Sequence, residues 1–527
     1  MTKVISIGTD RKIFEEGSSV RQRNIEYGKF FDQTHVVVFT TRIMNYESRI
    51  KISDNVFAYA TNSSSKLFYV FDAFFIIKKL FKNFKLKIKN SRSDCIVTAG
   101  DSFETGLVGV LAKLFFGLPL HVQVHTDPMR KYFRSLSVLN RLRFLVSEFV
   151  LKYADRVRVV SERVKKSIES FSKNIDVLPI KMEIAQGSAL EIKKPFPFTL
   201  LMVCRMEKEK NIEAVLQVVK NLENNEGIGL CIVGDGSEKE SLELLAGSLG
   251  LKEKVKFVGW QNDLAPYYKM ADVFISASLY EGYGVSTVEA AHFGKPLILS
   301  ETGVAGDLFK EGASVDGNYG SALVCDAKDS ACFSQNILKI YGDRNLAQKM
   351  GQSAKISADK HLNAIGNYFK EYADSVLKTA DGFKSRNFIS RIYDFKKTVF
   401  NSFIALRYLI CGFLSSVINI GVLYIFTDIA GIWYLYSSVV AFLASLVVSF
   451  VLQKFVVFKD MNKEKIRYQF SRFSVVAILG IITNTILIFI LVDFFGVWYV
   501  LSQIFAGLFV MFQNFILYKF FIFNKNK

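Results

Sequence analysis

Hydrophobic positions follow two different patterns along the chain, and the change lies near residue 400. Up to about residue 375, short apolar runs alternate with longer segments whose apolar residues recur at helical spacing. This alternation is typical of βαβ units, in which helices join parallel strands. Beyond residue 400 the apolar runs lengthen to about 20 residues, the length that crosses a bilayer.

The short apolar runs predict parallel sheets. The predicted strands are residues 4–8, 35–40, 95–100, 121–126, 156–161, 198–204, 229–234, 255–259, 272–278 and 296–300. The series is interrupted at residues 179–197. We therefore predict an α/β fold with two Rossmann-like domains, at residues 1–183 and 184–375.

Four long apolar runs follow, at residues 407–427, 434–453, 473–492 and 498–518. They are almost free of charged residues, and four in succession favour membrane-spanning helices over buried helices of a globular protein. Residues 401–527 are therefore predicted to form an α-helical membrane domain with four spans. A basic juxtamembrane linker, residues 376–400, precedes it.

This membrane half repeats itself at an offset of 65 residues without a gap. The matched pairs are Arg407 with Arg472, Asn419 with Asn484, Asp428 with Asp493, Trp433 with Trp498, Ala441 with Ala506, and Lys454 with Lys519. Chance does not explain this register. The four spans therefore form two internal repeats.

The distribution of charge gives an orientation and a partner. The loop between the repeats is rich in Lys and Arg, whereas the two outer loops, 428–433 and 493–498, have none. Positive-inside bias then places both termini and the preceding domains in the cytoplasm. Residues 376–527 hold 16 Lys and Arg against 6 Asp and Glu, so they contribute +10 of the net charge of +18. This excess indicates anionic membrane lipid, and not nucleic acid, as a partner.

The six cysteines and five histidines show no metal-ligand spacing. We expect the cysteines to be small, buried, reduced residues, and we predict no metal or other cofactor. The N-terminal MTKVISIGTDRK has no apolar core long enough for a signal peptide and is expected to begin with a strand. No feature of the sequence specifies an oligomeric state.

Candidate chemistry gathers after three predicted strands of the second domain. Cations come first, then a glycine turn, then two glutamates around further glycines: Arg205, Lys210, Gly234, Gly236, Glu281, Gly282, Tyr283, Gly284 and Glu289. The carboxyl ends of parallel strands meet at one edge of a sheet, where such sheets bind ligands. Cations beside a helix start suit a diphosphate, and carboxylates suit sugar and ribose hydroxyls. A nucleotide-sugar fits this set.

The motifs RMEKEKN (205–211), IVGDGSEKESLE (232–243) and ADVFISASLYEGYGVSTVEA (271–290) resemble the retaining glycosyltransferases of family 4, which have the GT-B fold. The resemblance implies that Arg205 and Lys210 neutralise the donor diphosphate. It also implies that Glu281, with backbone N–H groups near Gly282, Tyr283 and Gly284, binds the donor sugar, and that Glu289 binds the ribose. Such enzymes usually need no metal.

The first domain resembles this family less closely, and it would bind the acceptor. His125 stands where the family often has a histidine near the donor sugar, although a structural histidine at a strand end is the alternative. Gly17 and Ser18 replace the usual Gly-Gly pair near the phosphates and acceptor. Residues 75–92 and 130–153 interleave Lys and Arg with Phe and Leu. These stretches either contact lipid or form helices that pack on the sheet and turn basic outer faces to solvent.

Residues 401–527 resemble the GtrA-like family of four-span proteins, through the repeated Arg and Asn positions and the two FxLxKFxxF runs at the span ends. Such domains are linked to polyprenyl-phosphate sugars as proposed flippases or as anchors of synthases. Asn419 and Asn484 are expected to make interhelical hydrogen bonds, with lipid-phosphate contact as the alternative. Lys454 and Lys519 would meet a phosphate headgroup or snorkel to the interface.

Together these features predict an integral membrane glycosyltransferase that moves a sugar from a nucleoside-diphosphate sugar to a lipid-linked acceptor based on polyprenyl phosphate. The catalytic domains would face the cytoplasm. One alternative is a translocator, in which the four spans flip a lipid-linked sugar made by the fused enzyme. Another is an acceptor-binding protein with a degenerate transferase domain, which the intact Arg205, Lys210, Glu281 and Glu289 disfavour.

Overall fold

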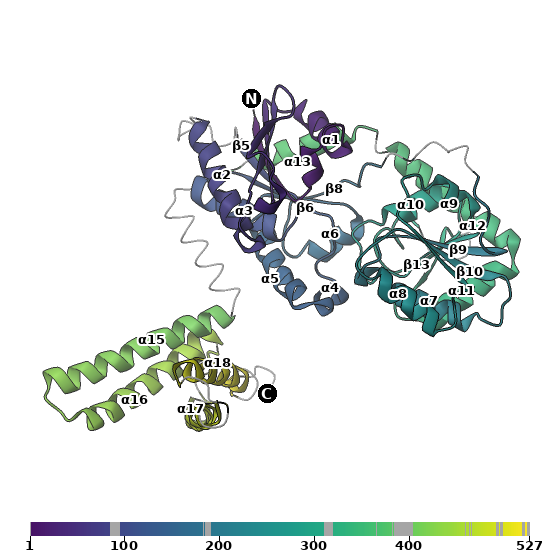
Figure 1. Ribbon diagram of the computed structural model, residues 1–527. Helices are drawn as coiled ribbons and strands as arrows, with labels where there is room; N and C mark the ends of the chain where they lie inside the picture. Colours follow the sequence, from purple (N-terminus) through teal and green to yellow (C-terminus); the bar gives the residue numbers. More distant parts are fainter. Residues whose placement is uncertain are drawn as a thin grey trace. The chain divides into compact units, whose positions relative to one another are not determined.

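The computed structural model describes residues 2–84, 95–182, 184, 191–309, 320–364, 366–381, 383, 404–458, 460–462, 464, 466–491, 495, 499–518 and 522–523. The chain divides into two compact units, Met1–Phe388 and Ile389–Lys527 (Figure 1). The first unit contains two sheets and the second is helical. Each unit is described by itself.

The first sheet has the strand order β3-β4-β2-β1-β5-β6-β7-β8 and is parallel except for β3, which pairs antiparallel with β4. Its strands are β1 (Lys3–Gly8), β2 (Gln33–Val38), β3 (Arg49–Lys51), β4 (Val56–Ala60), β5 (Cys95–Ala99), β6 (Leu120–Val124), β7 (Arg156–Val159) and β8 (Ile175–Val177). The helices before the second sheet are α1 (Ser19–Gly28), α2 (Tyr69–Asn83), α3 (Glu104–Phe116), α4 (Lys131–Leu136), α5 (Val138–Tyr153) and α6 (Glu162–Ile168). Helices on both faces bury the central strands completely, which explains why β5 is a continuous apolar run.

The second sheet is entirely parallel, with the order β11-β10-β9-β12-β13-β14. Its strands are β9 (Phe198–Val203), β10 (Ile228–Val233), β11 (Val255–Gly259), β12 (Val273–Ser276), β13 (Leu297–Ser300) and β14 (Ala322–Cys325). Its helices are α7 (Ile212–Asn221), α8 (Lys239–Ser248), α9 (Ala265–Met270), α10 (Val285–His292), α11 (Ser330–Gly342) and α12 (Arg344–Ala364). The order reverses between β9 and β12, and this is the switch point at which open sheets form a crevice.

Every predicted strand is confirmed, with ends shifted by no more than about two residues, a usual uncertainty of such boundaries. Four strands, β3, β4, β8 and β14, were not predicted. β3 and β8 are three-residue strands at the sheet edges, too short to show a pattern of their own. β4 lies second from an edge of the first sheet, and β14 lies at an edge of the second sheet. Both strands mix buried and half-buried positions.

The last helix of the first unit returns to the first domain. Helix α13 (Tyr368–Leu377) buries Tyr368 and Tyr372 in one cluster with Val4 and Ile96 of the first sheet. Ser375 Oγ donates to Asp176 Oδ2 (2.5 Å) and lies 3.3 Å from His121 Nε2. This crossing differs from the predicted boundary, which ended the second domain at residue 375.

The second unit contains two helical hairpins, formed by α15 with α16 and by α17 with α18. The helices are α15 (Ile404–Tyr424), α16 (Tyr434–Val451), α17 (Ile466–Phe489) and α18 (Tyr499–Leu517), and π-helical turns extend α15 to Ile429 and α16 to Val457. Among the described residues, one stretch, Val440–Val457, meets the length and hydropathy expected of a membrane span. That all four helices cross a membrane stays a prediction.

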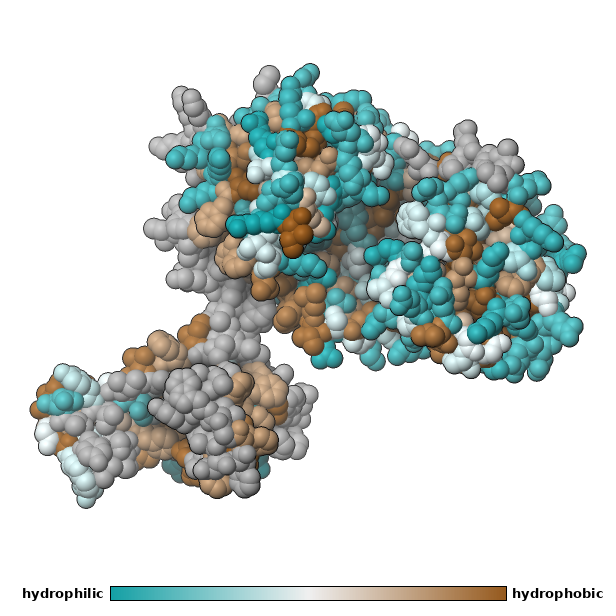
Figure 2. All heavy atoms as spheres, viewed as in Figure 1, coloured by the Kyte–Doolittle hydropathy of each residue, from teal (hydrophilic) through white to brown (hydrophobic). Residues whose placement is uncertain are grey.

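The surface of this unit is unusually apolar for protein facing water. Large side chains such as Phe413 (70% exposed) and Phe512 (63%) point outward. In Figure 2 the described surface along α15 is largely brown, whereas the first unit is mostly teal. Exposed apolar surface on this scale indicates contact with lipid or protein.

One expectation about cysteines is wrong. The structure joins Cys325, at the end of β14, to Cys332 in α11 by a disulfide. The two thiols are seven residues apart, and the short strand-to-helix turn brings their Cα atoms within 6.0 Å. The other four cysteines carry free thiols.

Candidate active site

A cavity of 550 Å³ lies at the carboxyl edge of the second sheet. It is lined by the residues that follow β9, β10, β11 and β12, together with His125 and Thr126 of the first domain. Most of the predicted donor-site residues line it, namely Arg205, Lys210, Gly234, Glu281, Gly282, Tyr283, Gly284 and Glu289. Gly236 lies in the same turn as Gly234 and is not among the lining residues.

The wall of this cavity contains an ion pair between Lys210 and Glu281. Lys210 Nζ donates to Glu281 Oε1 at 2.5 Å, and Ser278 Oγ donates to the same oxygen at 2.8 Å. The side chains are only 17% and 13% exposed. A pair this shielded from water is strong, and it holds one cation and one carboxylate in fixed positions.

Arg205 is held more loosely. Its Nη2 lies 3.1 Å from Glu209 Oε1, and its side chain is 69% exposed. An exposed ion pair of this kind contributes little to stability, and it can open when an anion competes for the guanidinium. Arg205 is therefore the more readily available cation for a phosphate, and Lys210 would share its charge between Glu281 and the phosphate.

The glycines permit close backbone packing. A Cβ atom at Gly234 would overlap the carbonyl of Cys204, and one at Gly236 would overlap that of Met206. Across the domains, a Cβ at Gly282 would overlap the carbonyl of His125. Gly284, with φ +93°, begins helix α10 in a conformation that other residues rarely adopt. Three of these glycines, Gly234, Gly282 and Gly284, line the cavity.

Glu289 is paired within its own domain. The hydroxyl of Tyr268 donates to Glu289 Oε2 at 2.6 Å. Burial raises the pKa of Glu289, and the hydrogen bond from Tyr268 lowers it. Tyr283 points away from this group, with its hydroxyl 2.6 Å from His361 Nε2, so its contribution to the cavity comes from the backbone.

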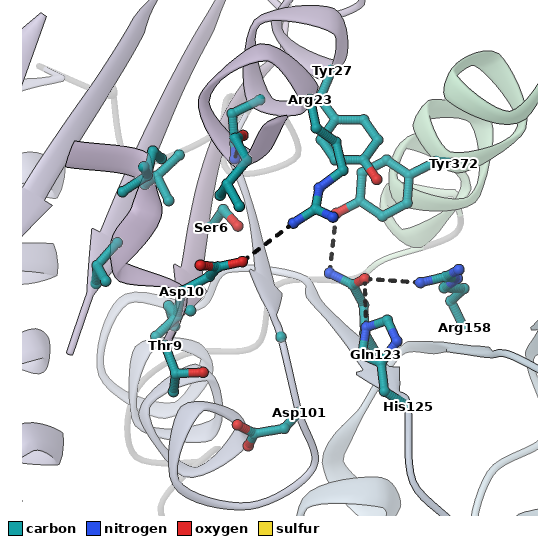
Figure 3. Close-up of a pocket in the computed structure, with 18 of the residues that line it drawn as sticks. Ser6, Thr9, Asp10, Arg23, Tyr27, Asp101, Gln123, His125, Arg158 and Tyr372 are labelled. Atoms are coloured by element: carbon teal, nitrogen blue, oxygen red, sulfur yellow. Dashed lines mark hydrogen bonds and ion pairs between the residues drawn. The ribbon is translucent and has the colours of Figure 1, made fainter. Parts of the chain in front are cut away.

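His125 lines two cavities, one on each side of it. The second cavity measures 370 Å³ and lies at the carboxyl edge of the first sheet (Figure 3). Burial of the His125 ring against the surrounding protein, together with the charges of Arg158 and Arg23, lowers its pKa. The ring is therefore neutral at physiological pH.

Gln123 fixes the protonation of that ring. Its Oε1 accepts from Arg158 Nη1 at 3.2 Å and lies 3.3 Å from His125 Nε2, while its Nε2 donates to the Tyr372 hydroxyl (Figure 3). Since a guanidinium only donates, the oxygen of the amide must face it. His125 Nε2 then carries the proton, and Nδ1 keeps a lone pair.

Several residues that line the 370 Å³ cavity of the first domain were not predicted. Asp10 follows β1, Asp101 follows β5, and Arg23 of α1 lies 3.6 Å from Asp10. Two signals in the sequence could have found some of them: Asp10 and Asp101 follow strand ends, and Gln123 lies two residues before His125 on the same face of a strand. Gly17 and Ser18 instead begin α1, where Ser18 Oγ accepts from Arg21 N at 3.2 Å.

In the second unit, two of the four predicted residues can be placed. Asn419 Nδ2 donates to Ser445 Oγ of the neighbouring helix at 3.2 Å. Lys454 is fully buried, with Nζ 2.5 Å from Gln469 Oε1 and 3.1 Å from Asp460 Oδ2, which differs from both predicted roles at a lipid interface. The Asn484 side chain and Lys519 lie outside the described residues.

The described parts of the chain contain no group of three or more His, Cys, Asp and Glu side chains placed to hold a metal ion. The independence from metals and cofactors stays a prediction.

Two families match this chain, each over part of its length. Residues 190–357 match the family described as "Glycosyl transferases group 1", and residues 407–523 match "GtrA/DPMS, transmembrane domain". The first match contains the Lys210–Glu281 pair, and the second contains the repeat.

Curated relatives resemble the glycosyltransferase part. The lipopolysaccharide core biosynthesis glycosyltransferase LpsE of Rhizobium meliloti is 26% identical over 32% of this chain and 44% of its own length. The alpha-monoglucosyldiacylglycerol synthase of Streptococcus pneumoniae is 28% identical over 38% and 51%. A Campylobacter jejuni N-acetylgalactosaminyltransferase, named for a PP-undecaprenol-linked acceptor, is 25% identical over 54% and 73%. The chain thus spans about half the length of most relatives it matches.

Solved structures share the fold of the first unit. Sucrose-phosphate synthase from Thermosynechococcus elongatus superposes with a TM-score of 0.55 at 19% identity, over 71% of this chain and 98% of that one. Anabaena HepE in complex with UDP-glucose gives 0.52 at 16% identity, over 71% and 100%. These likenesses show a common architecture of two Rossmann-like domains.

Proposed function

We propose that this chain, which joins a group 1 glycosyltransferase domain at residues 190–357 to a GtrA/DPMS transmembrane domain at residues 407–523, is a membrane-bound retaining glycosyltransferase. It moves a sugar of the hexose type from a nucleoside diphosphate to a lipid-linked acceptor based on polyprenyl phosphate. The catalytic domains work at the cytoplasmic face of the membrane, in polysaccharide or glycoconjugate synthesis.

The observation that carries this proposal is the shielded Lys210–Glu281 pair in the cavity of the second domain. Glu281 offers its second carboxylate oxygen to sugar hydroxyls. Lys210 and Arg205 supply positive charge for the diphosphate, and Glu289 accepts from ribose hydroxyls. The names of similar proteins support these substrates. HepE is found in complex with UDP-glucose, the Streptococcus pneumoniae enzyme makes monoglucosyldiacylglycerol, and the Campylobacter jejuni enzyme is named for a PP-undecaprenol-linked acceptor.

In the reaction, the bond between the anomeric carbon and the diphosphate oxygen breaks, and a bond to an acceptor oxygen forms on the same face. The acceptor hydroxyl loses its proton to the departing diphosphate, which carries away the electron pair of the broken bond. Arg205 and Lys210 stabilise the charge that develops on this leaving group. Neutral His125, between the two cavities, orients hydroxyls without adding charge.

The test uses the full-length protein in native membranes. Membranes are incubated with a panel of labelled nucleotide-sugars and then extracted with organic solvent. Label should enter the lipid phase with one of the donors, and not when Glu281→Ala replaces the wild type. Hydrolysis of every donor without lipid label would refute the proposed function. Movement of labelled lipid across sealed vesicles, measured in parallel, would support translocation as the role of the membrane unit.

A further inference from the structure

The Cys325–Cys332 disulfide closes a turn of the second domain between β14 and α11. Inside this turn, Asp329 Oδ1 accepts from Cys332 N at 2.9 Å and so begins α11. Helix α11 packs beside α7, the helix that follows Lys210 (Figure 1). The turn therefore neighbours the segment that carries Lys210, although the proposed reaction makes no use of it.

One side chain joins the disulfide turn to the donor cavity. Asn211 Nδ2 donates to the Ala327 carbonyl, within the turn, at 2.7 Å and to the Ala277 carbonyl, after β12, at 3.1 Å. Asn211 directly follows Lys210 and adopts φ +54°, a left-handed conformation that Asn tolerates better than most residues. Ala277 lies shortly before Glu281 in the loop after β12. The Asn211 amide thus links the turn to both segments that carry the Lys210–Glu281 pair.

The surroundings of the two sulfurs suit a bond that can be broken and formed again. Cys325 is 3% exposed, whereas Cys332 is half-buried, so an incoming thiol reaches Cys332 first. Asn336 Nδ2 donates to both sulfurs, at 3.2 Å from Cys325 Sγ and 3.5 Å from Cys332 Sγ. An amide donor in this place stabilises the negative charge that Cys325 takes on when the bond breaks.

The place of the disulfide in the chain favours a reversible role over a structural one. The two cysteines are seven residues apart, and a crosslink that closes so short a loop stabilises a fold less than one that closes a long loop. Disulfides are rare in reducing compartments, and those found there mostly act in catalysis or redox sensing. The proposed function puts this domain on the cytoplasmic, reducing side of a membrane.

We propose that the Cys325–Cys332 pair is a redox-sensitive site that takes a dithiol reductant, and that its state sets the position of Lys210 through Asn211. The inference rests on the proposed function, which supplies the compartment and the role of Lys210. The crosslinked form holds the Ala327 carbonyl on Asn211 and is the form that transfers sugar faster. Breaking the crosslink frees the turn and loosens this hydrogen bond, so Lys210 is held less firmly.

The chemical step is a thiol–disulfide exchange. A thiolate of the dithiol attacks Cys332 Sγ, the bond between the two sulfurs breaks, and Cys325 Sγ leaves with the electron pair and takes a proton from water. The second thiol of the dithiol then attacks the mixed disulfide and releases Cys332, which is protonated in turn. The protein gains two electrons and two protons, and the dithiol becomes a disulfide.

The experiment uses the full-length protein, treated with oxidised or reduced dithiothreitol that is then removed. Alkylation by iodoacetamide, mapped by mass spectrometry, should reach Cys325 and Cys332 only after reduction. In membranes, reduction should slow lipid glycosylation about tenfold, since small displacements in a catalytic site have effects of this size. In the purified protein, reduction should speed amide hydrogen exchange in residues 205–211. Reoxidation should restore both values.

Two variants test the route through Asn211. Cys325→Ser/Cys332→Ser cannot form the crosslink, so it should transfer at the rate of the reduced wild type and should not respond to dithiothreitol. Asn211→Gly tolerates the positive φ but lacks the amide, so its oxidised and reduced forms should transfer at one rate. The matched control is Cys231→Ala, which removes a free thiol from the same domain and should respond to reduction as the wild type does.

Alkylation of both cysteines without reduction would overturn the inference, as would transfer that is unchanged or faster after reduction. A response to dithiothreitol that survives in either test variant would overturn it too. Hydrogen exchange involves no sugar, so exchange that follows the redox state without any lipid glycosylation would count against the proposed function alone. Glycosylation that ignores the redox state would count against this inference alone.

Discussion

The backbone of Gly282 packs directly against the carbonyl of His125, with no room for a Cβ atom between them. Ser161 Oγ supports the contact by donating to the Gly282 carbonyl at 2.8 Å. This is a point where the two Rossmann-like domains meet beside the donor cavity. The glycine next to Glu281 thus sets how closely the domains approach.

Gly282→Ala should therefore slow transfer more than it unfolds the protein. The added methyl forces the domains apart at the cleft, and a displacement of about 1 Å in a catalytic site costs up to about a hundredfold in rate. Lipid glycosylation by membranes and thermal unfolding of the purified protein would measure the two effects. Gly342→Ala, where a Cβ meets nothing within 4 Å, is the control. Near-normal transfer in Gly282→Ala would contradict the role of this contact.

Lys210→Ala and Glu281→Ala should each lower transfer by about 10²–10³-fold, and the double variant should be little worse than either one. The reason is that each removal leaves the partner charge shielded from water and misplaced. Initial rates of transfer, measured with the donor that labels the lipid, would give the coupling free energy between Lys210 and Glu281. Lys194→Ala, which breaks the Lys194–Asp272 pair of the same domain, should leave transfer near wild type. Additive losses would show that the two side chains act separately.

Tyr268→Phe should shift the pH dependence of donor binding. Removing the hydroxyl removes the hydrogen bond that lowers the pKa of Glu289, so the pKa rises further above its ordinary value. Protonated Glu289 accepts hydrogen bonds from ribose hydroxyls poorly. As the pH falls, the donor KM of Tyr268→Phe should therefore begin to rise at a higher pH than the donor KM of the wild type. Donor KM measured from pH 5 to 8 tests this. Tyr267→Phe, at the neighbouring position, should follow the wild-type profile, and superimposable profiles for all three proteins would exclude the effect.

His121 should make the protein sensitive to acid. It is fully buried between Thr98 and Ser375, and burial lowers its pKa to about 3, against about 6.5 in the unfolded chain. The folded state binds fewer protons between these values, so stability falls as pH drops below 6.5. His121 alone should lower the free energy of unfolding by about 2 kcal/mol at pH 5. Denaturant unfolding at pH 7 and pH 5 should show a smaller pH effect in His121→Gln, and parallel pH effects would reject this assignment.

The sequence predicts the two sheets well because their central strands are buried on both faces and so appear as continuous apolar runs. It also predicts that Arg205, Lys210, Glu281 and Glu289 lie together, because they follow strand ends that meet at one edge of the sheet. The pairing of Lys210 with Glu281 spans 71 residues, and no local pattern encodes it.

The first domain was predicted less completely because its contacts are distant in sequence. Gln123 links Arg158 and Tyr372, and Tyr372 belongs to a helix 249 residues further along the chain. The disulfide was missed for a different reason: six scattered cysteines without a motif carry no information about which two a turn will bring together. The burial of Lys454 likewise depends on Gln469, in the next helix.

The return of α13 to the first sheet has a mechanical consequence. The segment that leads to the second unit follows α13, which packs on the first sheet. A pull on this segment would act on the first domain directly, and on the second domain through the two chain crossings between the sheets and through contacts such as that of Ser161 with Gly282. If the second unit is held in a membrane, we expect the cleft to open by movement of the second domain, while the first domain keeps its place.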